Sequence, residues 1–354
     1  MKKLRIGMVG AGSIAGTHLR AYQSVNNAEI VAICDINENH LNDTADKFGI
    51  EKRYNDEAEM LRCEELDAVD VCVWNSNHAP CSIMALENGL HVICEKPMAY
   101  SVEEAIKMKE AAEKNNKLLM IGFVMRFEKN TKVAADFIKA GKIGDIYYSR
   151  ATYLRRHGAP GGWFCKKEFS GGGPVIDLGV HVIDQTRYLM GSPKAVSVYA
   201  KTSDKIKNRP DIKNDIAYKP KDYKEGDLFD VEDFGTALIT YDNGATTLLE
   251  TSYSINSEDA YSTELFGAKG GIKMGDESDV KIFTEVCGYI SDIKPDLKCL
   301  KNTQPEFVAE LQHFTDCALN GETCIAGADE GIEVMKILSA IYESARTGHE
   351  VIID

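Results

Sequence analysis

The first third of the chain alternates short apolar runs with segments whose apolar residues recur at helical spacing. The apolar runs predict strands over residues 5–9, 29–34, 68–74, 91–94 and 117–123. The segments between them predict helices over residues 13–25, 37–48, 78–88 and 101–115. Strands that alternate with helices of this length are typical of βαβ units. The pattern therefore predicts an α/β domain over residues 1–123, with a doubly wound parallel sheet covered by helices on both faces.

The pattern changes after residue 124, where longer strand-like runs replace this alternation. Strands are predicted at residues 146–154, 195–201, 235–241 and 246–254, and Asp242-Asn243-Gly244 is a strong signal for a hairpin turn. Two helices are predicted at residues 305–319 and 329–347. Apolar residues mark one face of the second helix: Ile332, Met335, Leu338, Ile341 and Tyr342. Residues 124–354 are therefore predicted to form an α+β domain with a large, mostly antiparallel open sheet.

One long segment of this second domain is polar. Residues 201–230 carry many charges of both signs and few apolar side chains, which predicts an extended surface loop. Along the strand at residues 246–254, both alternating sets of side chains mix polar and apolar residues. This strand therefore gives no clear signal on whether the outer face of the sheet is apolar.

Composition and charge exclude several classes of function. The chain has 354 residues, 44% of them hydrophobic and 27% charged, and a net charge of -14. Such a charge opposes binding to nucleic acid or to an anionic membrane surface. No apolar run is long enough for a transmembrane helix, and no apolar leader follows Met1, so we expect a cytoplasmic protein. Ten cysteines without a CxxC pair favour reduced thiols over disulfides or a metal cluster, and no metal is expected.

The turn after the first predicted strand carries a dinucleotide-binding pattern. Gly10-Ala11-Gly12-Ser13-Ile14-Ala15 spells G-x-G-x-x-A. The first glycine allows a tight turn, the second lets a pyrophosphate approach the backbone, and the small third residue lets helix and strand pack closely. The start of the following helix then faces the phosphate charge. The pattern predicts a Rossmann-type dinucleotide site.

Asp35 ends the second predicted strand and indicates which dinucleotide is bound. At this position a carboxylate accepts hydrogen bonds from the adenosine ribose and repels a 2′-phosphate. Ile36 and Asn37 offer no arginine for that phosphate, so NAD is predicted over NADP. FAD would require a longer framework. The alternative for Asp35 is a helix N-cap or turn residue.

Two further motifs offer groups for catalysis. Glu95-Lys96-Pro97 closes the fifth predicted strand, and ligands of an open parallel sheet bind at the carboxyl ends of its strands. Lys96 is therefore predicted to lie beside the cofactor, although a plain turn with solvated charges would have the same sequence. A glycine-rich turn then leads into a predicted helix in which Asp177 and His181 are four residues apart and share a face. A buried acid there would orient the imidazole and raise its pKa. The alternatives are a structural His–Asp pair and one end of a metal site.

Taken together, these motifs resemble the Gfo/Idh/MocA family of oxidoreductases over nearly the whole chain. The resemblance rests on the glycine turn, the run from Asn75 through His78 to Glu95-Lys96-Pro97, Met125-Arg126-Phe127, Trp163 with the Asp177–His181 segment, and Ala340-Ile341-Tyr342-Glu343-Ser344. It implies that Lys96, Asp177 and His181 are the catalytic groups. It further implies that the residues along the cofactor are Gly10, Gly12, Ser13, Ile14, Asp35, Asn75, His78, Glu95, Lys96, Arg126 and Trp163. Trp74, where the family more often has a proline or a small residue, is also expected beside the cofactor.

The implied reaction is hydride transfer between NAD and a secondary hydroxyl or ketone of a polyol, a sugar or a cyclitol. His181 is expected to act as general base, Lys96 to stabilise the developing alkoxide, and Asp177 to orient His181 or relay its proton. Lys96, Tyr153, His157, Trp163, Asp177 and His181 are expected to contact the substrate. Arg155 and Arg156 would bind an anionic substrate, or would simply be solvated along with His157.

Other functions stay open on the sequence alone. They are a redox-assisted glycoside hydrolase that keeps NAD bound, a non-catalytic cofactor or sugar sensor of the same fold, and a metal-dependent enzyme that uses His181. The resemblance also implies a homodimer or homotetramer formed through the outer face of the second-domain sheet, which would otherwise leave a sheet face in water.

Overall fold

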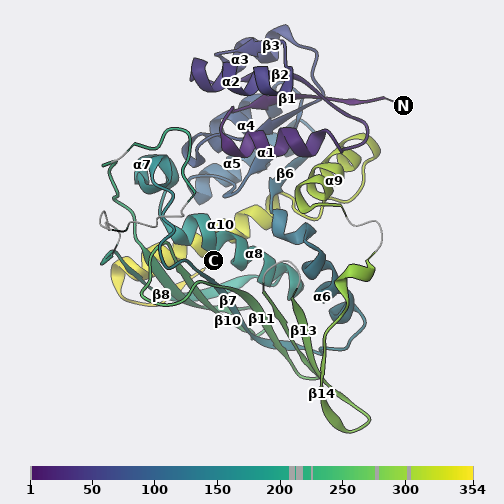
Figure 1. Cartoon of the computed structure of the whole chain (residues 1–354), viewed down its shortest axis with the longest axis vertical. Coiled ribbons are helices and arrows are strands. Elements are labelled where there is room, and N and C mark those ends of the chain that lie inside the picture. The colour runs from purple at the N-terminus through teal and green to yellow at the C-terminus, as the bar shows by residue number, and fades with distance from the viewer. Residues whose placement is uncertain are drawn as a thin grey trace.

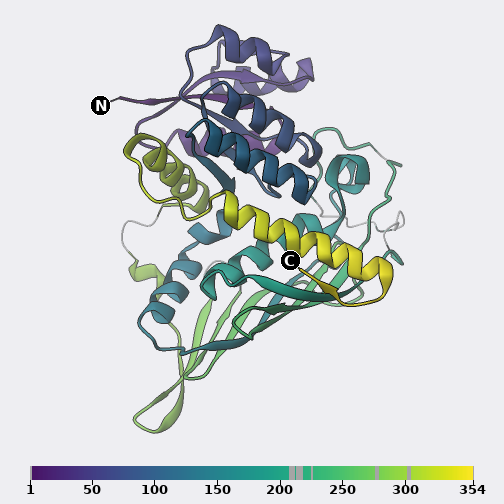
Figure 2. The ribbon, with the colours of Figure 1, turned by 180° about the vertical axis from the view of Figure 1, so that it is seen from behind.

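The computed structural model describes residues 2–206, 212, 218–224, 226–275, 279–300 and 304–353. Two sheets lie at opposite ends of the molecule, with a layer of helices between them (Figure 1, Figure 2). The first sheet has six strands in the order β3-β2-β1-β4-β5-β6, and every neighbouring pair is parallel. The second has nine strands in the order β14-β13-β12-β11-β7-β10-β9-β8-β15. Both predicted fold classes are confirmed.

The first sheet is built from alternating strands and helices, as predicted. Its elements are β1 (Leu4–Val9), α1 (Ser13–Tyr22), β2 (Ala28–Cys34), α2 (Glu38–Phe48), β3 (Lys52–Tyr54), α3 (Glu57–Cys63), β4 (Ala68–Val71), η1 (Asn75–Asn77), α4 (His78–Glu87), β5 (His91–Glu95), α5 (Val102–Lys114) and β6 (Leu119–Gly122). From β1 the chain adds strands outward on one side, to β2 and β3, and then crosses to β4 and adds β5 and β6 on the other side. The strand order therefore reverses between the neighbouring strands β1 and β4. The carboxyl ends of strands at such a reversal form the crevice in which ligands of open α/β sheets bind.

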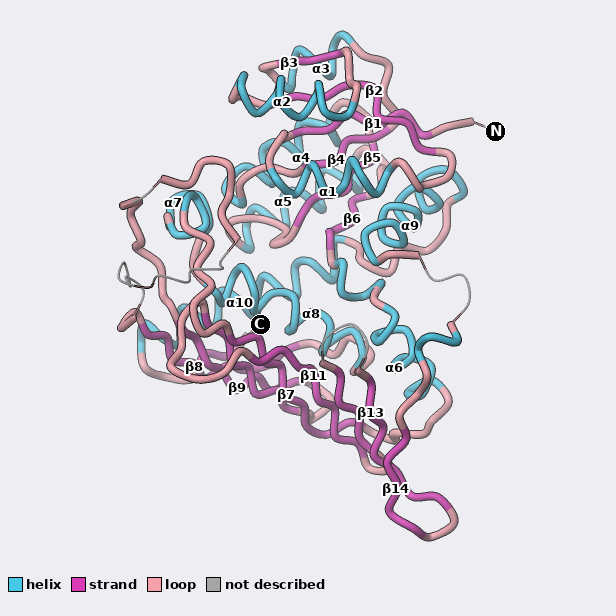
Figure 3. Tube along the Cα trace, viewed as in Figure 1, coloured by secondary structure: helices cyan, strands magenta, loops and turns pink. Residues whose placement is uncertain are grey.

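The second sheet is mixed, and its single parallel pair among the described strands is β7 with β10. Its strands are β7 (Ile146–Leu154), β8 (Ala195–Ser203), β9 (Phe234–Tyr241), β10 (Thr246–Ser252), β11 (Ala260–Gly267), β12 (Gly271–Met274), β13 (Val280–Val286), β14 (Tyr289–Ile293) and β15 (Val351–Ile352). The predicted hairpin joins β9 to β10, with Gly244 at φ 82°. The β13–β14 hairpin extends beyond the rest of the sheet (Figure 3).

Helices of the second half fill the space between the sheets. They are η2 (Val124–Phe127), α6 (Lys129–Lys139), η3 (Gly162–Cys165), α7 (Lys167–Ser170), η4 (Val175–Gly179), α8 (Val180–Leu189), η5 (Leu297–Cys299), α9 (Glu306–Asn320) and α10 (Ala328–Thr347). Figure 2 shows α10 running between the two sheets, and it packs on both α5 and β8. The side chains of Ile332, Met335, Leu338 and Ile341 on α10 are buried, which confirms the predicted apolar face.

The chain also returns to the first sheet near its end. Helix α9 packs against α1 and β1, although it follows residue 124 in the sequence. The division of the chain at residues 123 and 124 stays a prediction. Among the described residues, no helix is long and apolar enough to cross a membrane. The nine cysteines whose side chains are described carry free thiols.

Candidate active site

The turn between β1 and α1 has the geometry of a pyrophosphate cradle. Gly10 has φ +101°, and a Cβ at this residue would lie 2.2 Å from the carbonyl oxygen of Cys72, so only glycine fits. Gly12 is the N-cap of α1 and provides no side-chain cap, while nothing lies within 4 Å of the position where its Cβ would be. The start of α1 is therefore open to an anion. Ala15 is fully buried, which lets α1 approach the sheet closely.

Asp35 fastens this turn to the end of β2. Its Oδ2 accepts a hydrogen bond from the Ala11 N–H at 2.6 Å, and its Oδ1 accepts one from the Asn37 N–H at 2.7 Å. Asn37 caps α2 by accepting from the N–H groups of Asn39 and His40, so the N-cap alternative for Asp35 is wrong. The alternative that Asp35 is a turn residue is partly right, because its carboxylate accepts hydrogen bonds from the backbone of two turns. Each carboxylate oxygen keeps a second acceptor site for a ribose hydroxyl.

A cleft begins at the glycine turn and runs along the carboxyl ends of the strands. It is lined by Ser13, Ile14, Thr17, Val73, Asn75, His78, Glu95, Lys96, Trp163, Phe164, Asp177 and Tyr218. Eight of these residues were expected in the site from the sequence, namely Ser13, Ile14, Asn75, His78, Glu95, Lys96, Trp163 and Asp177. Both halves of the chain thus contribute to one cleft. A concave site with apolar walls and a few convergent polar groups is typical of cofactor and substrate binding.

At one end of the cleft, Lys96 is held by Asp177. The Lys96 Nζ donates to Asp177 Oδ1 and to the Asp177 carbonyl oxygen, both at 2.9 Å. The second carboxylate oxygen of Asp177 accepts from the buried Tyr253 hydroxyl at 3.0 Å. Burial raises the pKa of Asp177, but the charges of Lys96 and Arg155 offset this and hold the pKa below its usual value. Asp177 is therefore a carboxylate that directs the ammonium of Lys96.

His181 differs from the sequence-based expectation. Its pKa is lowered to about 3, first because it is buried and next because Lys96 is close, and the charge of Asp177 only partly offsets these effects. The expected raised pKa is therefore wrong. The spacing does not pair the two side chains, because Asp177 lies within the π-helical turn η4 that leads into α8. Its two carboxylate oxygens already bind Lys96 and Tyr253. The Nδ1 atom of His181 is buried and has no hydrogen-bond partner within the described part of the chain. His181 is a neutral imidazole with an unused polar atom.

Behind the cleft, Glu95 belongs to a buried chain of charged groups that the sequence analysis missed. Its Oε2 accepts from the Lys96 N–H at 3.1 Å, and its Oε1 lies 3.0 Å from Nε2 of His18. The other ring nitrogen of His18 lies 2.9 Å from Oδ2 of Asp70. Burial opposes the charge on His18, but Asp70 raises its pKa well above 6.5, and His18 in turn lowers the pKa of Glu95. An acidic residue inside the apolar run of β4 was the signal for this chain.

Asn75 and His78 support the backbone around the cleft. Asn75 Nδ2 donates to the Ser170 carbonyl oxygen at 2.8 Å and so joins η1 to α7. The buried ring of His78 lies between the carbonyl oxygens of Pro97 and Val73, at 2.6 and 3.2 Å. It therefore joins the chain just after Lys96 to the segment that follows β4.

The two tryptophans take different positions. Trp163 lines the cleft and stacks on Phe164, with ring centroids 3.9 Å apart. The ring of Trp74 packs on Phe169 with centroids 4.6 Å apart, and Trp74 is not among the residues that line the cleft. The geometry gives no support to a contact between Trp74 and the cofactor, because the Trp74 ring packs against Phe169 of α7.

Arg126 is likewise placed away from the lining of the cleft. Its guanidinium is buried and donates to Asp184 at 2.9 and 2.5 Å, to Glu330 at 2.9 Å and to the Ile325 carbonyl oxygen. Arg187 also binds Glu330, at 2.7 Å. The expected contact between Arg126 and the nicotinamide gains no support, because two carboxylates already satisfy its charge where η2, α8 and α10 meet.

The candidate substrate residues after β7 separate into two groups. Arg155 lies close enough to lower the pKa of Asp177, and its guanidinium donates to the Tyr153 hydroxyl and the Gly158 carbonyl oxygen, both at 3.2 Å. His157 forms a backbone bridge with Ser254. Arg156 is exposed, and its N–H donates to Asp259 at 2.5 Å. Tyr153 and Arg155 therefore lie toward the Lys96 end of the site and Arg156 lies toward solvent.

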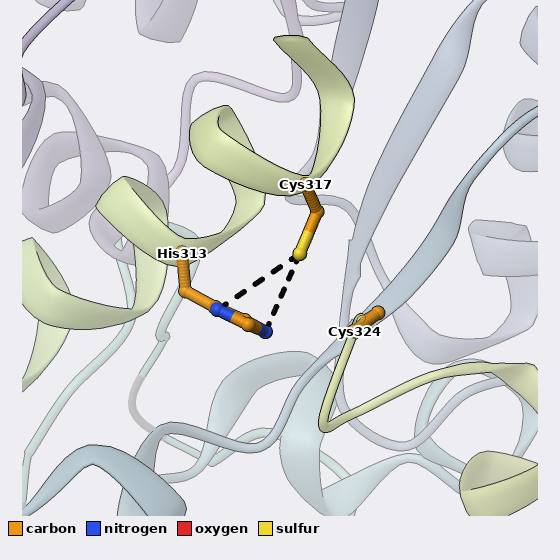
Figure 4. Close-up of side chains that lie close together, drawn as sticks. All are labelled: His313, Cys317 and Cys324. Carbon is orange, nitrogen blue, oxygen red and sulfur yellow. Dashed lines mark hydrogen bonds between the residues drawn. The ribbon is translucent and has the colours of Figure 1, made fainter. Parts of the chain in front are cut away.

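One cluster of side chains outside the cleft has the composition of a metal site. His313 and Cys317 lie one turn apart on α9 and meet Cys324 from the following loop (Figure 4). The lone pair of His313 Nε2 accepts from the Ile325 N–H at 3.1 Å, so it is used to hold this loop rather than offered to an ion. We assign no metal to this cluster. The same holds for His18, Asp70 and Cys72, which form the buried chain behind Glu95.

A glycine cradle at the start of α1 and a lysine held by Asp177 in the same cleft are typical of a dinucleotide-dependent oxidoreductase. Comparison with known protein families supports this class of protein. Residues 4–123 match the family described as the oxidoreductase family with an NAD-binding Rossmann fold, and residues 131–273 match the GFO/IDH/MocA C-terminal domain. The chain belongs to the Gfo/Idh/MocA family and is an NAD-dependent oxidoreductase.

Two relatives with named activities are similar to this chain over almost their full length. The chain is 32% identical to D-glucoside 3-dehydrogenase of Escherichia coli, over 98% of this chain and 97% of that protein. It is 30% identical to the NAD(+)-dependent scyllo-inositol 2-dehydrogenase of Bacillus subtilis, over 99% and 97%.

Solved structures share the fold. Aldose-aldose oxidoreductase from Caulobacter crescentus, complexed with glycerol, is 25% identical with a TM-score of 0.83, covering 99% of this chain and all of that one. Levoglucosan dehydrogenase in complex with NADH and levoglucosan has a TM-score of 0.87 at 24% identity, covering 99% of this chain and all of that one.

Proposed function

We propose that this protein oxidises a secondary hydroxyl of a pyranoside or a cyclitol to a ketone, and runs the same reaction in reverse. The observation that carries the proposal is the cleft lined by Ser13 at the start of α1, by Lys96 and by the aromatic ring of Trp163. Aromatic faces pack well on the C–H faces of sugar rings. The named activities of the relatives, on a D-glucoside and on scyllo-inositol, support this substrate class.

The proposed chemistry divides the work among three side chains. Bound NAD supplies the carbon that accepts the hydride. Lys96 donates a hydrogen bond to the substrate oxygen and stabilises its negative charge as the hydride leaves. Asp177, itself held by Tyr253, keeps the Lys96 ammonium aimed at that oxygen. This differs from the expected role of Asp177, because the structure pairs it with Lys96 rather than with His181.

His181 is the proposed proton acceptor. A neutral imidazole has a free lone pair, and His181 stays neutral because burial and Lys96 disfavour its charged form. As a proton leaves the substrate hydroxyl, the imidazole takes it, and in the reductive direction the resulting imidazolium returns it to the ketone oxygen. The low pKa makes that imidazolium a strong acid, which favours ketone reduction.

We further propose that Lys96, Tyr153, His157, Trp163, Asp177 and His181 contact the substrate. The Tyr153 hydroxyl and the Arg155 guanidinium lie near Asp177 and offer polar contacts to ring hydroxyls. Trp163 offers the stacking face. Proposed cofactor contacts come from Gly10, Gly12, Ser13, Ile14, Asp35, Asn75, His78, Glu95, Lys96 and Trp163, while Arg126 and Trp74 are left out for the reasons given above.

An absorbance assay for NADH tests the function directly. The purified protein is mixed with NAD and, in turn, methyl glucosides, levoglucosan, inositols and aldoses. NADH formation with a glucoside or an inositol supports the proposal. Silence across the panel while NADH still binds, or activity with simple primary alcohols alone, contradicts it.

The two alternative functions on this fold gain nothing from the comparisons. A redox-assisted glycoside hydrolase would release sugar without accumulating NADH, and a sensor would bind NAD without turnover. The two relatives described above, which cover nearly the whole chain, are named as dehydrogenases. The same assay, extended with a sugar-release measurement, separates all three functions.

We also propose that the protein forms a homodimer or a homotetramer in the cytoplasm. On the outer face of the second sheet, Tyr148 and Phe266 are paired under Arg150, and Leu238 is 45% exposed. A second copy would cover this face. The free thiols are consistent with a reducing compartment. Light scattering that gives a monomer mass would contradict the assembly, and export of the protein by its host would contradict the location.

A further inference from the structure

The segment formed by residues 218–224 reaches from the second domain to the glycine turn of the first. The Lys221 Nζ donates to the Ala11 carbonyl oxygen at 3.0 Å and to Thr44 Oγ1 at 2.8 Å. The Thr44 hydroxyl itself donates to the same carbonyl oxygen at 2.9 Å. A lysine from more than two hundred residues along the chain thus lies at the mouth of the Rossmann site.

The backbone of Ala11 connects this lysine to Asp35. The Ala11 N–H donates to Asp35 Oδ2 at 2.6 Å, while the carbonyl oxygen of the same residue accepts from Lys221. In a Rossmann domain the acid at the end of β2 binds the adenosine ribose, and the glycine turn approaches the adjoining pyrophosphate. The Lys221 ammonium and the Asp35 carboxylate therefore bind the same residue of that turn, next to the ribose position.

The segment is fitted to both walls of the cleft. A Cβ at Gly161 would lie 2.5 Å from the Tyr223 ring, and one at Gly162 would lie 2.6 Å from Cγ of Pro220. These two glycines form the turn that leads into Trp163. On the other side, Tyr218 lines the cleft together with Ser13. The contacts place Lys221 by packing as well as by its hydrogen bonds.

A lysine ammonium has three N–H donors, and Lys221 spends two of them on Ala11 and Thr44. Among the described residues no further hydrogen bond uses the third donor, so it and the positive charge can bind a ligand. An arginine near this position is the usual partner of a 2′-phosphate in dinucleotide sites, and an acid without a cation excludes that phosphate. Here the acid and a cation are both present.

We propose that Lys221 is a specificity-determining residue of the cofactor site, and that it lets the enzyme bind 2′-phosphorylated NADP(H) in addition to NAD(H). Asp35 still favours the unphosphorylated ribose. Lys221 neutralises part of the repulsion that Asp35 exerts on a 2′-phosphate and donates a charge-assisted hydrogen bond to it. The inference rests on the proposed function only in placing a dinucleotide on the glycine turn.

The test is direct binding of NADH, NADPH and 2′,5′-ADP to the wild-type enzyme and to Lys221→Ala, by fluorescence or calorimetry. The probe 2′,5′-ADP carries the phosphate but no nicotinamide. We expect the wild type to bind all three, and Lys221→Ala to lose roughly 10- to 100-fold in affinity for NADPH and 2′,5′-ADP but less than about threefold for NADH. Lys221→Arg should keep the binding of 2′,5′-ADP.

Lys224→Ala is the matched control, because it removes a positive charge from the same segment without a side-chain contact to the glycine turn among the described hydrogen bonds. It should leave all three affinities within about twofold of wild type. Equal loss of NADH and NADPH binding in Lys221→Ala, or a wild type that binds NADH but not 2′,5′-ADP, would overturn the proposal. Binding of 2′,5′-ADP that depends on Lys221 in an enzyme inactive on every sugar would instead contradict the proposed function alone.

Discussion

At the scale of single residues, the geometry of the site depends on which side chain each charged group binds. Asp177 and His181 are close in sequence, and a helical spacing predicts that they pair. In the structure Asp177 binds Lys96 and Tyr253. The motifs located Lys96, Asp177 and His181, but the sequence did not show the π-helical turn of η4 or the hydroxyl of Tyr253, which follows β10 directly. Both depend on tertiary packing, which spacing in one segment does not report.

Replacing Tyr253 with phenylalanine tests this arrangement. The change removes only the hydroxyl that donates to Asp177, so Lys96 loses its fixed direction while the ring still fills the core. We expect kcat to fall roughly tenfold with little change in NADH affinity, as for loss of one hydrogen bond to a charged group. Steady-state kinetics and NADH titration measure the two effects. Tyr241→Phe is the control, since its buried hydroxyl binds Thr247 away from the cleft. A variant as active as Tyr241→Phe would show that Tyr253 has no positioning role.

The pH dependence of oxidation tests the state of His181. Because its pKa is lowered to about 3, the imidazole is already the neutral base at every pH above that value. The pH profile of kcat/KM reports ionisations of the free enzyme. We therefore expect no loss of kcat/KM near pH 6.5 that can be assigned to His181. A limb in that region that disappears in His181→Asn would contradict the account.

At the scale of elements, local periodicity predicted the parallel strands and the long helices well. It missed β3, α3, α6, β15 and the strands from β11 to β14. These elements are short or partly exposed, and Ile290 of β14 is 92% exposed, so they lack the continuous apolar runs that a buried strand shows. The charged chain from β4 through α1 to β5 also escaped prediction. Its members come from three elements, and only folding brings them together.

His18 should be important for stability, because it separates the buried carboxylates of Asp70 and Glu95. His18→Ala leaves two buried acids without their cation, and we expect the free energy of unfolding to fall by about 3 kcal/mol or more. Urea unfolding measures it, with the exposed His349→Ala as control. The folded-state pKa of His18 is raised, so its contribution should be complete below pH about 6.5 and be lost as pH rises through that higher pKa. A loss equal to that of His349→Ala would contradict this role.

At the scale of the whole molecule, the two halves of the chain share the work of building one site. The first supplies the glycine turn and Lys96, and the second supplies Asp177, Trp163 and the segment with Lys221. The division into two fold classes was predictable because each half has its own period. Contacts between the halves were not, and residues 201–230 show why. A polar segment has no apolar pattern from which its contacts could be predicted. The structure shows that residues 218–224 of this segment contact the glycine turn through Lys221. The predicted loop residues 207–211, 213–217 and 225 lie outside the described residues.

Arg126 tests the placement of one such contact between distant segments. Its ion pairs with Asp184 and Glu330 join α8 to α10, and Arg126 is not among the residues that line the cleft. Arg126→Met leaves the buried carboxylate of Asp184 without its partner, while Glu330 keeps Arg187, so we expect a loss of about 3 kcal/mol in unfolding free energy. NADH affinity of the folded variant should stay within about twofold of wild type. Denaturant unfolding and NADH titration measure both quantities. A large loss of NADH affinity with unchanged stability would restore the expected cofactor contact.

The most direct test of the central claim is the rate of NADH formation by Lys96→Ala on a sugar or cyclitol that the wild type oxidises, measured together with NADH affinity. Lys96 is proposed to act on the substrate oxygen only as charge develops, so its removal should lower kcat by about a hundredfold or more and leave NADH affinity nearly unchanged. Turnover close to wild type in Lys96→Ala would contradict the assignment of this cleft as the catalytic site.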